Sequence, residues 1–102
     1  MQKIGIYGGT FDPIHHAHLI LARFALEKFA LEKIIFVPTR VSPYKNDSVA
    51  SPETRLQMLR SAIEGEPQFE VDDCELQRAP PSYTIDTIQA LKEKWPDAHL
   101  FF

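Results

Sequence analysis

The sequence predicts an α/β protein built on a mainly parallel sheet, and three observations lead to this fold class. Short β-prone runs alternate with helix-like stretches along the chain, an order that is typical of βαβ units. The run Ile34–Val37 is apolar at every position and is followed by Pro38, as expected for a strand buried on both faces. With the segments before it, this run completes a β-turn-α-β unit of the length that a right-handed crossover needs.

The first unit occupies the start of the chain. Lys3–Tyr7 is short and β-prone and predicts a strand, and Gly8–Pro13 predicts a turn. His16–Phe29 is rich in Ala and Leu and predicts a helix, because its apolar residues recur at helical spacing. These residues are Leu19, Ala22, Leu26 and Phe29.

A second helix is predicted after a polar segment. Thr39–Ala50 combines a proline with Asn, Asp and several serines, which favours a loop. The triplet Ser51-Pro52-Glu53 then provides a cap residue, a proline for the first turn and an acid near the positive end of the helix dipole. The helix is expected to end just before Gly65.

The last third of the chain predicts a further strand, helix and strand. Phe69–Val71 is expected to be a short strand, and Pro80-Pro81 marks a loop. A helix is predicted to open at Tyr83–Asp86 and to end before Pro96, with Leu100–Phe102 as the next strand. The apolar positions of this helix are Ile85, Ile88 and Leu91.

Composition and charge limit the classes of function. A chain of 102 residues with 44% apolar and 25% charged residues suits one small globular domain. The formal net charge of −3 argues against a large non-specific nucleic-acid or membrane surface. Cys74 is the single cysteine, so no intramolecular disulfide can form. No signal peptide and no apolar run of membrane-spanning length is recognised, so we expect a cytoplasmic protein.

The final residues of the chain are unusual for a terminus. Ala98–Phe102 is mostly apolar and resembles the beginning of a buried strand, whereas exposed termini are usually polar. We therefore expect residues 1–102 to be the N-terminal portion of a longer chain.

The stretch GGTFDP suggests where a ligand binds. In open α/β sheets, ligands bind at the carboxyl ends of the strands, and Gly8 and Gly9 follow the first predicted strand. Glycines let a ligand approach the backbone, Thr10 adds a hydroxyl, and the helix starting near His16 directs free N–H groups to the same spot. The stretch matches neither the P-loop nor the G-x-G-x-x-G pattern, so a simple tight turn is about equally compatible with the glycines alone.

Three histidines at the start of the helix carry the strongest chemical signal. His15 and His18 are three residues apart and should share one face, whereas His16 should point elsewhere. A metal site would need further ligands, and only Asp12 is near. The second interpretation is that these are partly exposed histidines at a helix start with no function, which would be favoured if each histidine stood alone. Glycines, a helix N-terminus and two neighbouring imidazoles favour a third interpretation, in which the imidazoles stabilise charge on a transferred phosphoryl group.

These residues resemble a known family. GGTFDPIHHAHL is similar to the signature of nucleotidyltransferases with an H-x-G-H motif, and most closely to that of the bacterial nicotinate-nucleotide adenylyltransferases. SPYKND around Lys45 and VDDCELQRAPPSYTIDTIQAL resemble two later family segments, in the same order. The chain departs from the family at Ala17, where the motif has Gly, and at Tyr44, where His is usual. It also ends before the family's second nucleotide-binding motif, Ser/Thr-x-x-Arg.

The resemblance implies a fold and a reaction. The fold would be a Rossmann-like, doubly wound, mainly parallel sheet that is incomplete because its C-terminal part is missing. The reaction would be adenylyl transfer from ATP to nicotinate mononucleotide, which gives nicotinate adenine dinucleotide and pyrophosphate in NAD biosynthesis. Mg²⁺ would accompany ATP, bridged by phosphates more than by protein groups, and no metal site in the protein is expected.

The resemblance also implies roles for individual residues. His15 and His18 would be catalytic and contact the ATP phosphates, with His18 the stronger candidate for the transferred group. The nucleotide would be bound by Gly8, Gly9, Thr10, Phe11 and Lys45. Backbone amides of Ser82, Tyr83 and Thr84 would hold the pyridine carboxylate. The alternative for Lys45 is a solvated side chain without a ligand, and the alternative for Thr84 is a plain helix cap.

Two other functions stay open at this point. One is a related adenylyltransferase with another phosphate acceptor such as phosphopantetheine, against which His15 and the Pro-Ser-Tyr-Thr segment count. The other is an inactive nucleotide-binding fragment. The oligomeric state, and the preference between nicotinate and nicotinamide, are not determined by these residues.

Overall fold

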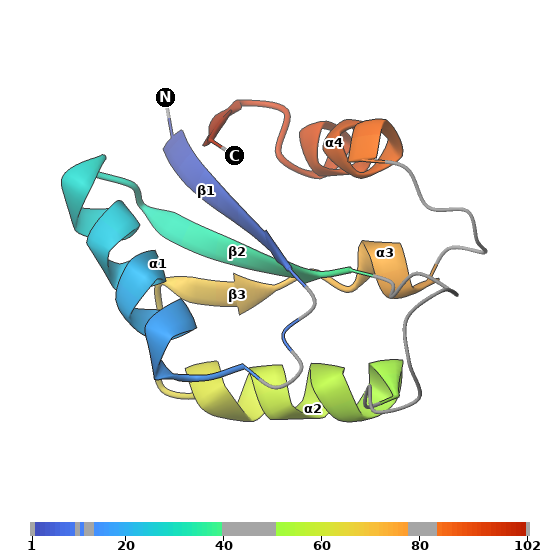
Figure 1. The fold of residues 1–102 in the computed structure, drawn as a ribbon. Helices are drawn as coiled ribbons and strands as arrows, with labels where there is room; N and C mark the ends of the chain where they lie inside the picture. Colours follow the sequence, from blue (N-terminus) through green and yellow to red (C-terminus); the bar gives the residue numbers. More distant parts are fainter. Residues whose placement is uncertain (1, 10, 12–13, 40–50, 78–83, 102) are drawn as a thin grey trace.

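The described part of the chain forms a four-stranded parallel sheet with helices on both faces (Figure 1). The computed structural model describes residues 2–9, 11, 14–39, 51–77 and 84–101. The strands are β1 (Gln2–Gly9), β2 (Lys33–Pro38), β3 (Phe69–Val71) and β4 (Ala98–Phe101). The helices are α1 (His16–Lys28), α2 (Pro52–Ile63), α3 (Cys74–Gln77) and α4 (Thr84–Lys94).

The strand order confirms the predicted fold class. The order is β3-β2-β1-β4, and all three neighbouring pairs are parallel. The chain starts at β1 in the interior of the sheet, adds β2 and β3 on one side, and returns through α4 to place β4 on the other side. This reversal of direction is what defines a doubly wound sheet.

Side chains of β2 alternate between two apolar cores. Ile34 and Phe36 face α1 and α2, in a cluster with Leu26 and Leu59. Ile35 and Val37 face the opposite side, where they pack with Ile4 and Leu91 of α4. This confirms the prediction, made from the uninterrupted apolar run, that the strand is buried on both faces.

The end of β1 differs from the prediction. Gly8 and Gly9 are paired strand residues, opposite Val37 and Pro38, and not part of a turn. The backbone N–H of Thr39 also donates to the carbonyl of Gly9 at 2.9 Å. The predicted boundary was wrong because glycine is a poor indicator of strand, whereas here the length of the neighbouring strand sets the pairing.

Helix α2 begins and ends as its sequence predicts. The Ser51 hydroxyl accepts a hydrogen bond from the Thr54 backbone N–H at 3.1 Å, and Pro52 opens the first turn. The helix ends at Ile63, and Gly65 has a φ of +84°, a left-handed conformation that glycine adopts without strain. Within α2, Arg55 is buried and donates from Nη1 to the Thr39 carbonyl at 2.9 Å.

The short helix α3 was not predicted. It follows Asp72, whose carboxylate accepts a hydrogen bond from the Cys74 backbone N–H at 2.9 Å. The other carboxylate oxygen accepts from Lys94 of α4 at 3.1 Å. A helix of four residues is too short for a periodic apolar pattern, so only the two aspartates before it, Asp72 and Asp73, could have indicated its start.

None of the helices among the described residues is both long and apolar enough to cross a membrane.

Candidate active site at the start of helix α1

The end of β1 and the start of α1 carry five described residues of the predicted site, namely Gly8, Gly9, Phe11, His15 and His18. β1 ends at Gly9 at the carboxyl edge of the sheet, and α1 begins at His16. Figure 1 shows the chain leaving β1 and crossing to the start of α1, on the face of the sheet that α2 also covers. This edge is where ligands bind in doubly wound sheets.

His15 and His18 together cap helix α1. His15 is the N-cap residue, and its Nδ1 accepts a hydrogen bond from the Ala17 backbone N–H at 3.2 Å. The Nδ1 of His18 accepts from the backbone N–H of His15 at 3.0 Å. This reciprocal arrangement is the one that Ser or Thr and Glu usually provide in a capping box, with two imidazoles in their place.

The cap determines which nitrogen of each ring carries the proton. A ring nitrogen that accepts a hydrogen bond has no hydrogen of its own, so the proton of a neutral imidazole must lie on the other nitrogen. In both histidines that nitrogen is Nε2, because Nδ1 is the acceptor. The ring centroids are 4.0 Å apart. The prediction that these two histidines lie together is confirmed, and together they offer two N–H donors.

His16 lies apart from this pair. It is exposed and lines a shallow hollow with Arg23, Glu66 and Phe69. In that hollow Arg23 forms an ion pair with Glu66. The prediction that His16 points elsewhere is therefore confirmed.

Aromatic rings surround His18 on its inner side. Its centroid lies 5.1 Å from that of Phe11 and 6.1 Å from that of Tyr7. Burial, and to a smaller extent the neighbouring His15, lower the pKa of His18 below its usual value. Both effects favour the neutral ring that the cap requires.

Gly8 and Gly9 differ in what surrounds the position that a side chain would take. Among the described residues, a Cβ added to Gly8 would meet only the Val37 carbonyl, at 3.9 Å, which is ordinary van der Waals distance. A Cβ added to Gly9 would lie 3.2 Å from the ring of Phe11. On the side where its Cβ would lie, Gly9 therefore leaves room for the Phe11 ring, whereas the close approach of a ligand to Gly8 and Gly9 stays a prediction.

The helix N-terminus is partly occupied by its own cap. The Ala17 N–H donates to His15, and the His18 N–H donates to the His15 carbonyl at 3.0 Å. An anion that uses the Ala17 amide must therefore displace the His15 ring. The imidazole Nε2–H groups take no part in the cap.

Several predicted site residues lie outside the described residues. These are Thr10, Lys45, Ser82 and Tyr83, as well as Asp12. Thr84 is the first residue of α4, as expected for a residue at a helix start. Among the residues that the structure does describe, no three His, Cys, Asp or Glu side chains gather as metal ligands would.

Tyr7 lies beside the candidate site, and the sequence analysis did not single it out. It appeared only as part of the first strand, yet its ring contacts Phe11 and Phe36 and approaches His18. The one feature of the sequence that could have indicated Tyr7 is its position directly before the two glycines, since its ring lies 6.1 Å from that of His18 at the start of α1.

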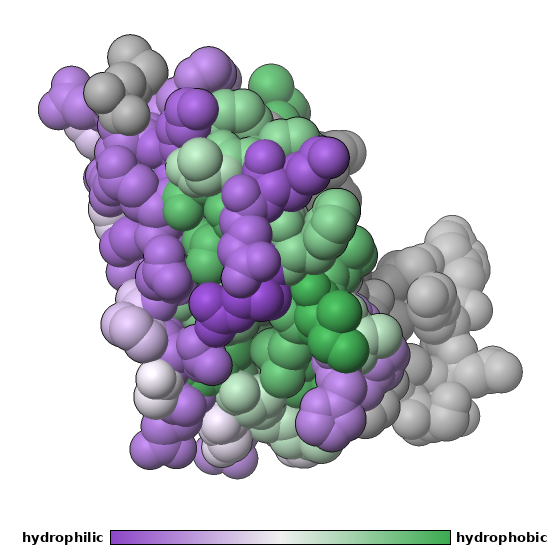
Figure 2. All heavy atoms as spheres, turned by 90° about the vertical axis from the view of Figure 1, so that its left-hand side faces the viewer, coloured by the Kyte–Doolittle hydropathy of each residue, from purple (hydrophilic) through white to green (hydrophobic). Residues whose placement is uncertain are grey.

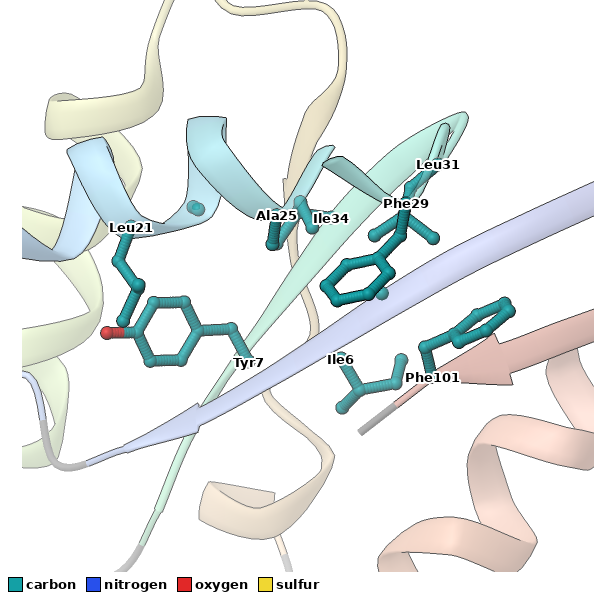
Figure 3. Close-up of a pocket in the computed structure, with 10 residues that line it drawn as sticks. Ile6, Tyr7, Leu21, Ala25, Phe29, Leu31, Ile34 and Phe101 are labelled. Carbon is teal, nitrogen blue, oxygen red and sulfur yellow. The ribbon is translucent and has the colours of Figure 1, made fainter. Parts of the chain in front are cut away.

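An apolar groove lies between α1 and the strands β1 and β4. Figure 3 shows Leu21, Ala25 and Phe29 directed from the α1 segment toward Tyr7 and toward Phe101 of β4. The groove has a volume of about 270 Å³. Leu21 and Phe29 are 54% and 53% exposed, and Figure 2 shows apolar side chains gathered on this side of the molecule.

Comparison with known proteins identifies relatives over the whole chain. The sequence model of a family described as cytidylyltransferase-like matches residues 6–102. A probable nicotinate-nucleotide adenylyltransferase of Geobacillus thermodenitrificans is 48% identical over 100% of this chain and 48% of its own length. The nicotinate-nucleotide adenylyltransferase of Bacillus subtilis is 43% identical over 100% of this chain and 54% of its own length. The chain thus spans about half the length of these relatives.

Solved structures show the same fold. The nicotinic acid mononucleotide adenylyltransferase of Plasmodium falciparum, complexed with NaAD, matches 98% of this chain and 50% of its own chain, with a TM-score of 0.76 and 22% identity. A putative nicotinate-nucleotide adenylyltransferase of Vibrio parahaemolyticus matches with a TM-score of 0.71 and 19% identity, over 98% of this chain and 55% of its own.

Proposed function

Because the chain belongs to the cytidylyltransferase-like family, we propose that it is part of an enzyme that transfers the adenylyl group of ATP to nicotinate mononucleotide. The products are nicotinate adenine dinucleotide and pyrophosphate, a step of NAD biosynthesis. The names of the relatives support this substrate pair. The observation that carries the proposal is the pair of imidazoles His15 and His18, whose Nδ1 atoms accept the hydrogen bonds of the helix cap, so that their Nε2 atoms are left to donate to a ligand at the carboxyl edge of the sheet.

The chemistry needs positioning more than a reactive side chain. A phosphate oxygen of the mononucleotide attacks the α-phosphorus of ATP, and the bond from the α-phosphorus to the bridging oxygen breaks as pyrophosphate leaves. The attacking oxygen is already anionic, so no general base is required. His18, and with it His15, donates hydrogen bonds to phosphate oxygens on which negative charge increases during transfer.

The remaining residues complete the proposed binding site. The backbone at Gly8 admits the nucleotide most closely, since no side chain of the described residues lies where its Cβ would be. Gly9, Thr10 and Phe11 belong to the same segment, and Lys45 contacts a substrate phosphate. Backbone amides at Ser82, Tyr83 and Thr84 hold the carboxylate of the pyridine ring.

Mg²⁺ enters this proposal as a companion of ATP. It prefers oxygen ligands and keeps several waters, so the phosphates of ATP hold it, and no step is assigned to it. The substrates ATP and nicotinate mononucleotide occur in the cytoplasm, which is the proposed location of the enzyme.

We further propose that residues 1–102 are the N-terminal portion of a longer enzyme. The matched relatives have about twice this length. The apolar groove beside α1 supports the proposal, because parallel sheets are normally covered on both faces, and no described helix covers the groove.

Kinetics of the full-length enzyme test the assignment of His18. The change is His18→Ala, assayed by pyrophosphate release from ATP with nicotinate mononucleotide, nicotinamide mononucleotide or phosphopantetheine as acceptor. We expect the wild-type enzyme to prefer the nicotinate compound as acceptor. In His18→Ala, kcat/KM should fall by about 10²–10³-fold, the range found for loss of one charge-stabilising donor.

The neighbouring His16→Ala variant is the matched control, because His16 lies outside the pair. It should change kcat/KM by less than about threefold. Equal losses in the two variants would remove His18 from the mechanism, and preference for another acceptor would overturn the substrate assignment.

A further inference from the structure

Phe11 has an unusual backbone and a buried side chain. Its φ is +50°, in the left-handed region that residues other than glycine rarely adopt. Its side chain is only 3% exposed. A residue is held in this conformation only where its surroundings determine it, and such residues cluster at functional sites.

Gly9 makes this conformation of Phe11 possible. The Phe11 ring lies so close to Gly9 that an added Cβ would be 3.2 Å from Cζ and 3.3 Å from Cε1. Such contacts are tighter than van der Waals packing tolerates without movement. Because Gly9 has no side chain, the Phe11 ring can pack against its backbone.

The Phe11 ring connects the apolar core with His18. It meets Phe36 of β2 at 5.7 Å and Tyr7 of β1 at 5.4 Å. On the other side it meets the His18 ring at 5.1 Å with an interplanar angle of 80°. This perpendicular arrangement is the one that aromatic rings favour, and it limits rotation of the imidazole.

Two constraints of different kinds therefore act on His18. The hydrogen bond from the His15 backbone fixes the proton on Nε2. The Phe11 ring restricts the plane of the imidazole and removes water from one side of it. We propose that Phe11 is a positioning residue, which holds the neutral His18 ring in the orientation that presents Nε2–H to a phosphate group. This proposal deepens the proposed function and depends on it.

The test combines NMR and kinetics on the full-length protein. Phe11→Leu keeps an apolar side chain but removes the aromatic ring. Without the Phe11 ring the imidazole can rotate out of its hydrogen bond with the His15 amide, so in the free protein long-range ¹H–¹⁵N spectra should show that His18 loses its pure Nε2–H form and that its pKa moves up toward the ordinary value. With substrates, kcat should fall about tenfold or more, while KM for ATP changes less than threefold.

Gly9→Ala provides a second variant that leaves Phe11 unaltered. The added methyl group displaces the ring, so the His18 signals should shift in the same direction as in Phe11→Leu. Phe69→Leu is the matched control, since Phe69 is also buried in the same core and contacts Phe36. It should lower stability without changing the His18 spectrum or kcat.

The outcomes separate this inference from the proposed function. An unchanged His18 spectrum in Phe11→Leu, or equal loss of kcat in Phe11→Leu and Phe69→Leu, would overturn the positioning role. Changed His18 signals in Phe11→Leu together with full activity of His18→Ala would instead reject the proposed function, since His18 would be held by Phe11 but not used.

Discussion

At the scale of residues, one imidazole has both a structural and a chemical role. His18 completes the cap of α1 through Nδ1 and leaves Nε2–H for a ligand. The two roles agree only while the ring is neutral, because protonation of Nδ1 replaces its lone pair with a hydrogen. The cap therefore makes the local structure sensitive to pH.

The stability of the protein should reflect this sensitivity. The pKa of His18 lies below its ordinary value of 6.5 in the folded protein, through burial and then through His15. The unfolded chain then binds the proton more readily than the folded one, so the contribution of His18 is complete above pH 6.5 and is lost as the pH falls below it. The titratable side chains that the described structure places against His18 are His15 and Tyr7.

Urea unfolding of wild type and His18→Gln at pH 7.5 and 5.5 measures this effect. Glutamine can accept the same backbone hydrogen bond but does not titrate. We expect the free energy of unfolding of the wild type to fall more on acidification than that of the variant. Identical falls would mean that His18 is not linked to folding.

The sequence revealed the histidine pair but not its surroundings. Spacing of three residues at a helix start was enough to place His15 and His18 together. The burial of Phe11 and the position of Tyr7 depend on which strands neighbour β1, and local spacing contains no such information. The contact between the Phe11 ring and Gly9 was not predicted either, because it depends on a left-handed backbone conformation of Phe11 that the sequence pattern does not indicate.

At the scale of elements, long helices were predictable and short ones were not. α2 has a serine cap, a proline in its first turn and a glycine after its end, and each is present in the structure. α3 lacks such signals and depends on the Asp72 carboxylate, which Lys94 of α4 also contacts. The formation of α3 thus depends on contacts between residues distant in the sequence, such as Asp72 and Lys94, and not on its own four residues alone.

The cap of α2 supports a quantitative prediction. Ser51→Ala removes the acceptor for the Thr54 N–H, which is 3.1 Å away. The free energy of unfolding should fall by about 0.5–2 kcal/mol, the usual cost of losing an N-cap side chain. Thermal or urea unfolding measures the change.

Ser61→Ala is the matched control within the same helix. Ser61 is exposed and lies inside α2, where alanine is at least as favourable. A loss in Ser61→Ala equal to that in Ser51→Ala would contradict a capping role for Ser51.

At the scale of the whole molecule, the main feature is an uneven covering of the sheet. α1 and α2 cover one face over β2 and its neighbours, and α4 covers the other face. Beside α1 the groove between Tyr7 and Phe101 stays open, with Leu21 and Phe29 half exposed. Open apolar surface of this kind usually marks a contact with further polypeptide.

Dye binding tests whether the groove is accessible in the 102-residue chain. We expect anilinonaphthalene sulfonate to fluoresce with this chain, and Leu21→Gln or Phe29→Gln to reduce the signal at least twofold. Ile85→Gln is the control, because Ile85 is 60% exposed but lies on α4 and does not line the groove. An equal reduction in Ile85→Gln would show that the dye does not report on the groove.

The position of β1 has a consequence for synthesis of the protein on the ribosome. One edge of β1 pairs with β2, but the other pairs with Ala98–Phe101, almost a hundred residues later. The nascent chain can assemble the first crossover early, yet its leading strand keeps one row of amides and carbonyls unsatisfied until translation has passed residue 101. During that interval the strand is open to pairing with other chains, as unpaired strand edges generally are, so expression is expected to depend on chaperones that bind nascent polypeptides.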